Sequence, residues 1–253
     1  MSKKQIIFRI DDVGASSKQF EVYSNLFLGN FLFLKYLPTF AAWGPYHELE
    51  YTTWVKICEI LQKYRAKVTV AITASWVEKD SRLIPFPKKL PSQANILLKG
   101  VRSNLIEIAN HGLTHCVVGK HLPKLFSSNR KFHREFWDWV AEEIHYKYLA
   151  ESQKILQDYF GKVVTFVPPG NVWTKDTEKA AFANGLKYLC TKSDLVKTGE
   201  KSNGLTYIGD SEALVIHDRD IVKKGISWLK GQLEGFVRQG FEITAVSDFE
   251  KGS

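Results

Sequence analysis

Apolar runs of strand length alternate along this chain with longer stretches that repeat apolar residues at helical spacing. The first run, from Ile6 to Ile10, predicts a buried strand, and later runs of the same kind predict further strands. Trp54, Ile57 and Leu61 are typical of an amphipathic helix between two of them. The later predicted strands cover 67–73, 107–110, 162–167, 186–190, 213–218 and 241–246, and the predicted helices cover 50–64, 93–99, 131–160, 175–184 and 222–239.

This alternation predicts an α/β fold with a parallel sheet that closes, or nearly closes, as a (β/α) barrel. An open doubly wound sheet is the alternative. We expect residues 1–253 to form a single domain, because no linker-like segment divides them. Closely spaced prolines oppose helices and central strands, so Pro85, Pro87 and Pro91 predict a loop.

Two adjacent carboxylates, Asp11 and Asp12, follow the first apolar run, and Gly14 allows the chain to turn behind them. In parallel α/β folds the carboxyl ends of the strands are where ligands bind and catalytic groups collect. The pair therefore suits a metal ligand and a base. A helix cap or a turn is the simpler interpretation of two aspartates considered alone.

A second strand end presents two imidazoles four residues apart, at His111 and His115. If the chain turns helical at His111, both rings share one face and can reach one cation. Two histidines and a carboxylate are a common ligand set for a catalytic divalent metal. Ordinary polar core residues are the alternative. A third predicted strand, 213–218, again presents a titratable group at its end, His217.

The net charge of +8 and a pI near 9.2 favour an anionic partner, such as nucleic acid, anionic lipid or a phosphate-bearing substrate. No zinc-finger, RNP-like or basic-zipper pattern accompanies this charge, so we expect no specific nucleic-acid binding. Three cysteines without CxxC spacing are typical of reduced thiols in the cytoplasm. The start of the chain lacks the pattern of a secretory signal, which also predicts a cytoplasmic protein.

Four segments together resemble the polysaccharide deacetylase superfamily, the NodB-homology or carbohydrate esterase family 4 proteins. The resemblance covers residues 8 to 217. The four segments are 8–14, similar to the family's TFDDG motif; 111–115, similar to H-[ST]-x-x-H with glycine at the small position; 166–170, similar to R-x-P-x-G; and 214–217, which matches L-x-H.

The resemblance implies a distorted (β/α) barrel with a divalent metal, usually zinc in this family, held by Asp12, His111 and His115. It also implies that Asp11 is the general base and His217 the general acid. The segment Pro168, Pro169 and Gly170 is implied to contact the substrate, with the Gly170 N–H directed at the oxyanion.

Two positions depart from the family pattern. The motif's arginine, which steadies the catalytic aspartate in the family, is Val167 here, and the aspartate-tryptophan motif is not clear. Asp194 is the nearest candidate for the acid that tunes the histidine. These departures concern acid-base tuning and leave the implied metal ligands intact.

The expected function is a metal-dependent hydrolase that removes an N-acetyl group from an amino sugar. A non-exported enzyme would meet a nucleotide- or lipid-linked precursor of a polysaccharide, so contact with an anionic membrane is also expected. The rim segment 119–139 carries cations and aromatic residues suited to such a substrate, although a solvated basic face over an aromatic core is the alternative. A small-molecule C–N hydrolase of the cyclic ureide type and an inactive sugar-binding barrel are the alternative functions.

Overall fold

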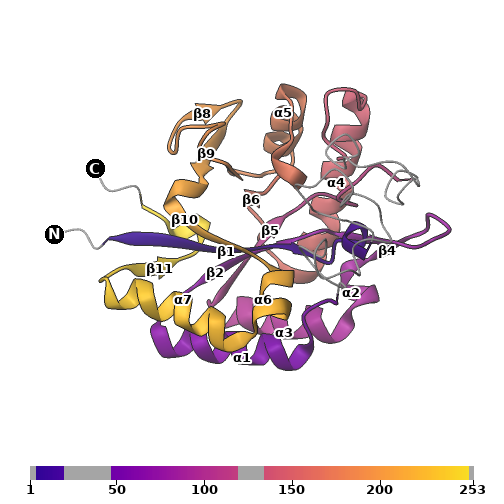
Figure 1. Cartoon of the computed structure of the whole chain (residues 1–253). Coiled ribbons are helices and arrows are strands. Elements are labelled where there is room, and N and C mark those ends of the chain that lie inside the picture. Colours follow the sequence, from indigo (N-terminus) through magenta and orange to yellow (C-terminus); the bar gives the residue numbers. More distant parts are fainter. Residues whose placement is uncertain (1–3, 20–46, 119–133, 251–253) are drawn as a thin grey trace, which may run out of the picture.

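A nine-stranded sheet forms the centre of the computed structural model, which describes residues 4–19, 47–118 and 134–250 (Figure 1). The strand order is β10-β1-β2-β5-β6-β7-β9-β8, and β11 pairs with the beginning of β1. All pairings in this sheet are parallel except that of β8 with β9. The strands are β1 (Gln5–Val13), β2 (Val68–Ile72), β3 (Ser75–Val77), β4 (Leu83–Pro85), β5 (Ile106–Asn110), β6 (Thr165–Phe166), β7 (Tyr188–Thr191), β8 (Lys201–Ser202), β9 (Leu205–Gly209), β10 (Ala213–His217) and β11 (Glu242–Thr244).

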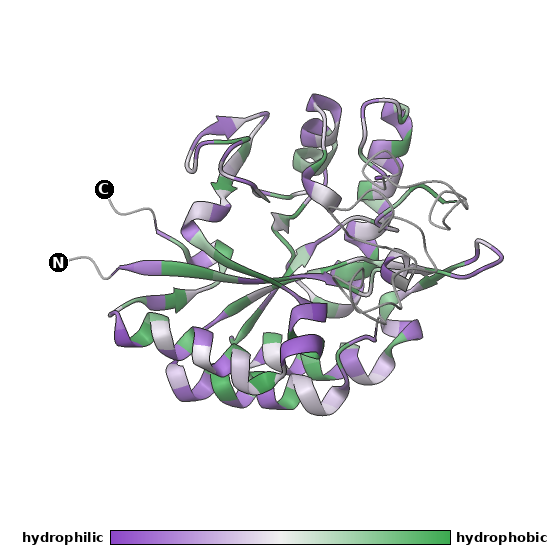
Figure 2. Cartoon of the chain, viewed as in Figure 1, coloured by the Kyte–Doolittle hydropathy of each residue, from purple (hydrophilic) through white to green (hydrophobic). Residues whose placement is uncertain are grey.

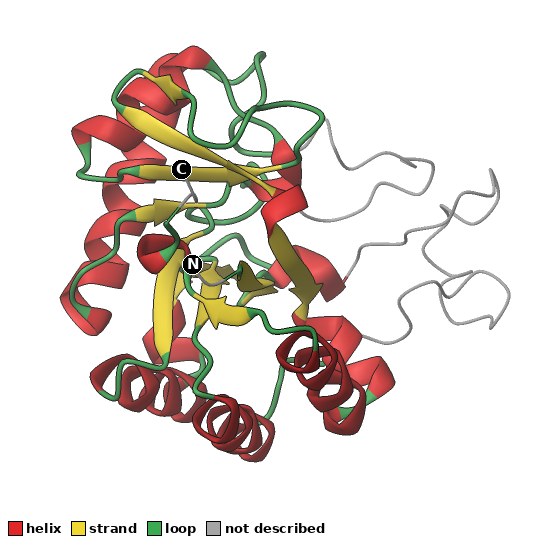
Figure 3. Cartoon of the chain, turned by 90° about the vertical axis from the view of Figure 1, so that its left-hand side faces the viewer, coloured by secondary structure: helices red, strands yellow, loops and turns green. Residues whose placement is uncertain are grey.

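Helices lie outside the strands, as Figure 3 shows, and neighbouring helices contact one another in the order α5, α4, α3, α1, α7 and α6. Such an outer layer is what strand–helix alternation predicts. Within the described ranges, no helix combines the length and the apolarity needed to cross a membrane. The helices are α1 (Tyr51–Tyr64), α2 (Phe86–Lys89), α3 (Pro91–Arg102), α4 (Glu142–Phe160), α5 (Lys175–Ala183), α6 (Asp218–Lys224) and α7 (Ile226–Arg238).

The hydrophobic core lies between the sheet and these helices, and Figure 2 shows hydrophobic residues along the strands and a mixture of hydrophobic and hydrophilic residues along the helices. Every residue of β2 is buried, as expected for a strand with neighbours on both edges. On α1 the buried residues Trp54, Ile57 and Leu61 follow helical spacing. The expected distorted (β/α) barrel is confirmed. Among the described residues, no strand pairing joins β10 to β9, so the barrel is open there.

The predicted loop around the three prolines is wrong. Pro85 ends β4, Pro87 lies in the first turn of α2, and Pro91 is the first residue of α3. Proline is tolerated at the start of a helix, because the first N–H groups have no partner within the helix. Pro85 belongs to a two-stranded sheet, where each strand has a free edge.

Two predicted helices differ from the observed ones. The stretch predicted as 131–160 is helical only from Glu142, and its described part before that residue forms turns. The stretch predicted as 222–239 is two helices, because Gly225 separates α6 from α7 with a φ of 82°. The hairpin of β8 and β9 was not predicted from the sequence.

Candidate functional site

A bulge at the end of β1 presents the two aspartates. Ile10 pairs with Val70 and Val13 with Ile72, so β1 contains one residue more than β2 across this stretch. Asp12 adopts the left-handed conformation, with a φ of 69°. A bulge re-aims side chains and increases the local twist, and bulges recur next to active sites. Asp11 keeps its place in the ladder, opposite His217 of β10.

The two histidines follow β5 in a loop. The strand ends at Asn110, directly before His111; Gly112 has a φ of 80°, and His115 has a φ of 69°. The condition that the chain turns helical at His111 is therefore not met, because the loop contains these left-handed residues. The two rings still meet, with centroids 5.1 Å apart. A non-glycine residue at positive φ costs energy and persists where the surroundings hold it, and such residues cluster at functional sites.

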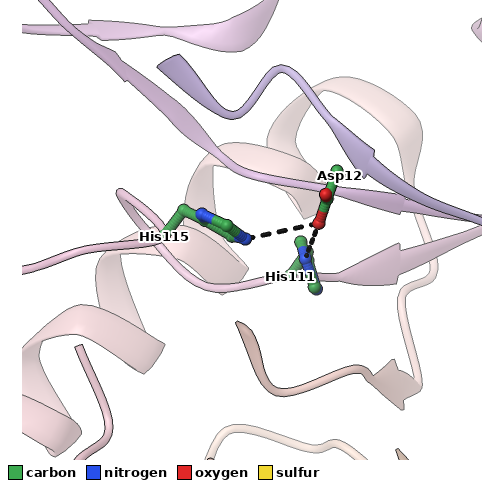
Figure 4. Close-up of side chains that lie close together, drawn as sticks. All are labelled: Asp12, His111 and His115. Atoms are coloured by element: carbon green, nitrogen blue, oxygen red, sulfur yellow. Dashed lines mark hydrogen bonds and ion pairs between the residues drawn. The ribbon is translucent and has the colours of Figure 1, made fainter. Parts of the chain in front are cut away.

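One carboxylate oxygen joins these segments (Figure 4). Asp12 Oδ1 lies 3.1 Å from His111 Nε2 and 3.3 Å from His115 Nε2. All three residues are buried, and their ligating atoms lie within 4.8 Å of one another. Side chains separated by about a hundred residues in sequence thus converge on one point, as the sequence indicated.

The hydrogen bonds of His111 test whether a cation suits this point. His111 Nδ1 lies 2.6 Å from the carbonyl oxygen of Val167, which can only accept, so Nδ1 carries the proton. A neutral ring then directs the lone pair of Nε2 at an oxygen of Asp12. A cation between the two atoms would relieve that repulsion, and a backbone carbonyl behind the ring is the usual support of a metal-bound histidine. The protonation of His111 at Nδ1 therefore fits a divalent metal bound through its Nε2.

Two buried cations hold Asp12 in place. Arg219 Nη2 donates to Asp12 Oδ2 over 2.9 Å, which leaves Oδ1 for the histidines. Lys18 donates to the backbone carbonyl of Asp12 and to Asp218 Oδ2. Burial disfavours a charged Asp12, but the charge of the nearby His217 opposes this effect, and the pKa of Asp12 lies well below its usual range. Neither Lys18 nor Arg219 was identified from the sequence.

A buried carboxylate, Glu135, supports the histidine loop. Its oxygens accept from the backbone N–H groups of Thr114 and His115 over 3.1 and 3.2 Å. A Cβ atom at Gly112 would lie 1.7 Å from Glu135 Oε1, so the glycine makes room for this carboxylate. Burial raises the pKa of Glu135 to about 8, against the hydrogen bonds that it accepts.

His217 lies at the end of β10 and is partly exposed, with 36% of its side chain accessible. Its backbone N–H donates to Asp220 Oδ2 over 3.1 Å, and its Nδ1 lies 3.8 Å from the same oxygen. Burial opposes a cationic ring, but Asp12, Asp220 and Asp11 outweigh it and raise the pKa of His217. The interaction with His217 in turn lowers the pKa of Asp220 to about 2.

The structure does not bring Asp194 to this group. Asp194 is exposed in the loop after β7, where it lines a surface pocket with Ser193 and Ser211. The carboxylate beside His217 is Asp220, three residues further along the chain. A sequence signal existed, since an aspartate at the third position of a helix commonly pairs with the residue before that helix.

The segment after β6 borders the site. Val167 contacts His111 through its carbonyl, and Pro168 and Pro169 are buried next to it. At Gly170, where φ is 65°, a Cβ atom would lie 2.7 Å from Arg134 Nε, so Arg134 covers this turn. Arg134 Nη1 also lies 2.6 Å from His115 Nδ1.

Most of the predicted cationic rim lies outside the described residues. The cations Lys120, Lys124, Arg130 and Lys131 fall there, as does Phe132. Within the described part, Phe136 is buried in the core and Trp139 is 44% exposed.

Comparisons with known proteins indicate the family and the fold of this chain. A sequence profile of the family described as polysaccharide deacetylase matches residues 44–189. The matched range contains His111, His115 and the turn at Gly170, but not the aspartates of β1 or His217. No curated protein matches the chain in sequence.

Three solved structures illustrate the likeness in fold. The 4-alpha-glucanotransferase from Thermococcus litoralis has a TM-score of 0.56 at 12% identity, with 98% of this chain and 40% of that chain covered. The peptidoglycan deacetylase PdaC from Bacillus subtilis has a TM-score of 0.51 at 12% identity, with 97% and 89% covered. BA3943, a CE4 family pseudoenzyme from Bacillus anthracis, has a TM-score of 0.50 at 13% identity, with 97% and 65% covered. At these identities the likeness concerns the fold.

Proposed function

Because this chain belongs to the polysaccharide deacetylase family, whose profile matches more than half of its 253 residues, we propose that it is a metal-dependent hydrolase that removes an N-acetyl group from an amino sugar. One observation carries the proposal: Asp12, His111 and His115 converge from two strand ends, with Asp11 and His217 beside them. Three protein ligands leave coordination positions open for water and substrate, as catalytic sites require.

The proposed metal is zinc, bound to Asp12, His111 and His115, where a divalent ion would polarise the acetyl carbonyl and acidify a bound water. Asp11 accepts the proton of the attacking water. The Gly170 N–H donates to the oxyanion of the tetrahedral intermediate, where one such donor is worth roughly 3–4 kcal/mol.

His217 completes the reaction, because an amine is a very poor leaving group unless it is protonated. The surrounding carboxylates raise the pKa of His217 against the effect of burial, which favours the cation that a general acid requires. Proton donation to the leaving nitrogen typically contributes about 10²–10⁴-fold to the rate. The C–N bond then breaks to give acetate and the free amino sugar.

The proposed substrate is a nucleotide- or lipid-linked precursor of a polysaccharide, which we place in the cytoplasm and at an anionic membrane surface. Two features support an anionic substrate: the net charge of +8, and Arg134 beside His115 and over Gly170.

Acetate release and metal content test this function together. Purified protein is assayed with zinc, cobalt or manganese on N-acetylglucosamine oligomers, a nucleotide-linked N-acetyl sugar and a cyclic ureide. We expect one metal per chain and turnover of an acetylated sugar. Alanine at Asp12, His111 or His115 should remove the metal. Ureide turnover alone would favour the small-molecule C–N hydrolase, and sugar binding without turnover would favour the inactive barrel.

Two further variants separate catalysis from metal binding. Asp11→Asn and His217→Ala should keep the metal and lose roughly 10²–10⁴-fold in kcat. Asp158→Asn is the matched control, because Asp158 is an exposed acid of α4 that pairs with Lys154. Near-normal turnover in both site variants, or a loss explained by unfolding, would contradict the assigned roles.

A further inference from the structure

A buried arginine holds both oxygens of the proposed base. Arg9 Nε donates to Asp11 Oδ1 over 2.8 Å, and Arg9 Nη2 donates to Asp11 Oδ2 over 2.9 Å. Both residues are about 95% buried, with 4% and 5% of their surfaces accessible. They are two positions apart on β1, so their side chains leave the strand on the same face. The contact is thus a forked pair formed within one strand.

Val167 occupies the position where the family motif has an arginine. Val167 is 1% exposed and packs in a cluster with Ile7, Ala109 and Cys190. Cys190 also faces Arg9, and burial raises the pKa of its thiol to about 12, so the thiol stays neutral. The guanidinium on Asp11 therefore comes from β1 itself.

The fork geometry matters for a general base. A carboxylate bound by one guanidinium at both oxygens cannot rotate about its Cβ–Cγ bond without losing a hydrogen bond, so its remaining lone pairs keep one direction. A lysine ammonium offers a single point of contact and leaves that rotation free. Misplacement of a reacting group by about 1 Å can cost on the order of 100-fold in rate.

We propose that Arg9 is the positioning residue for Asp11, in place of the arginine that the family motif carries at the position of Val167. The proposal rests on the proposed function, because it concerns how the base of that reaction is oriented. In this proposal Arg9 acts through Asp11, to which both of its hydrogen bonds to a carboxylate run.

A double-mutant cycle tests this role. Arg9→Gln and Arg9→Lys are each measured alone and in combination with Asp11→Asn, in the full chain, with metal content and circular dichroism recorded for every variant. We expect each Arg9 variant alone to lower kcat on the order of 100-fold, with KM and metal content unchanged. In the Asp11→Asn background, the same Arg9 changes should cost nothing further, because the group that Arg9 orients is already lost.

Arg9→Lys keeps the positive charge but loses the forked contact with Asp11, so it separates orientation of the base from charge. The exposed Arg102 provides the control. Arg102→Gln on α3 should leave kcat unchanged in both backgrounds. Wild-type kcat in Arg9→Lys would show that charge alone suffices and would overturn the proposal. Losses that add in the double variants, or that follow the metal content, would also overturn it. A wild-type protein that turns over no substrate would instead refute the proposed function, and the role of Arg9 with it.

Discussion

Asp220 is a residue whose charge we expect to contribute to the pH dependence of the reaction, beside the larger effect of Asp12 on the pKa of His217. Its carboxylate contacts His217 at Nδ1 and at the backbone N–H, and its negative charge favours the protonated imidazole. Asp220→Asn removes that charge, so the pKa of His217 should fall. A general acid is lost as the pH rises through its pKa, and the alkaline limb of kcat/KM should therefore move to lower pH.

The pH profile of kcat/KM from pH 5 to pH 10 measures this shift, with Asp194→Asn as the control. Asp194 is an exposed aspartate on a loop that does not contact His217 in the described structure. If Asp194→Asn moved the alkaline limb of kcat/KM and Asp220→Asn did not, the acid that tunes His217 would be Asp194.

The loop from His111 to His115 depends on the space that Gly112 leaves for Glu135. Gly112→Ala should destabilise the fold by more than the strain of a left-handed alanine, about 1–2 kcal/mol, because the new methyl group also displaces the buried carboxylate. It should also weaken metal binding, since Glu135 accepts from the backbone of His115.

Gly185→Ala is the matched control for strain. Gly185 has a φ of 81°, close to the 80° of Gly112, but a Cβ atom there meets nothing within 4 Å. Urea unfolding and metal titration of both variants separate the effect of backbone strain from the effect of displacing the Glu135 side chain. If both variants lost the same stability and kept their metal affinity, displacement of Glu135 would have no effect on the loop, which would contradict the prediction.

A bound metal should stabilise the whole molecule, because its proposed ligands lie on two segments of the barrel, the end of β1 and the loop after β5. A ligand present at a hundred times its Kd stabilises by about 2.7 kcal/mol, which corresponds to a rise in Tm of roughly 5–10 °C for a chain of this size. Differential scanning calorimetry with zinc after chelator treatment measures it. Asp12→Ala should abolish the rise and Asp220→Asn should keep it. A rise of equal size in Asp12→Ala would place the metal elsewhere.

Local pattern was enough to locate the strand ends that carry Asp11, Asp12, His111 and His217. Strand periodicity, helical spacing and turn residues act over a few neighbouring positions, so they can be read along the chain. The resemblance to the deacetylase motifs then suggested a shared role for these ends. Both the fold class and the convergence of Asp12 with the two histidines agree with that reading.

The groups that support these residues could not be predicted in the same way. Glu135 reaches His115 across a loop, Arg219 reaches Asp12 from the helix that follows the neighbouring strand β10, and Asp220, not Asp194, lies beside His217. The left-handed conformations of Asp12 and His115 are likewise held by such contacts. Contacts of this kind depend on burial and on the pairing of strands far apart in sequence, and no local pattern encodes which polar groups will share a low-dielectric interior.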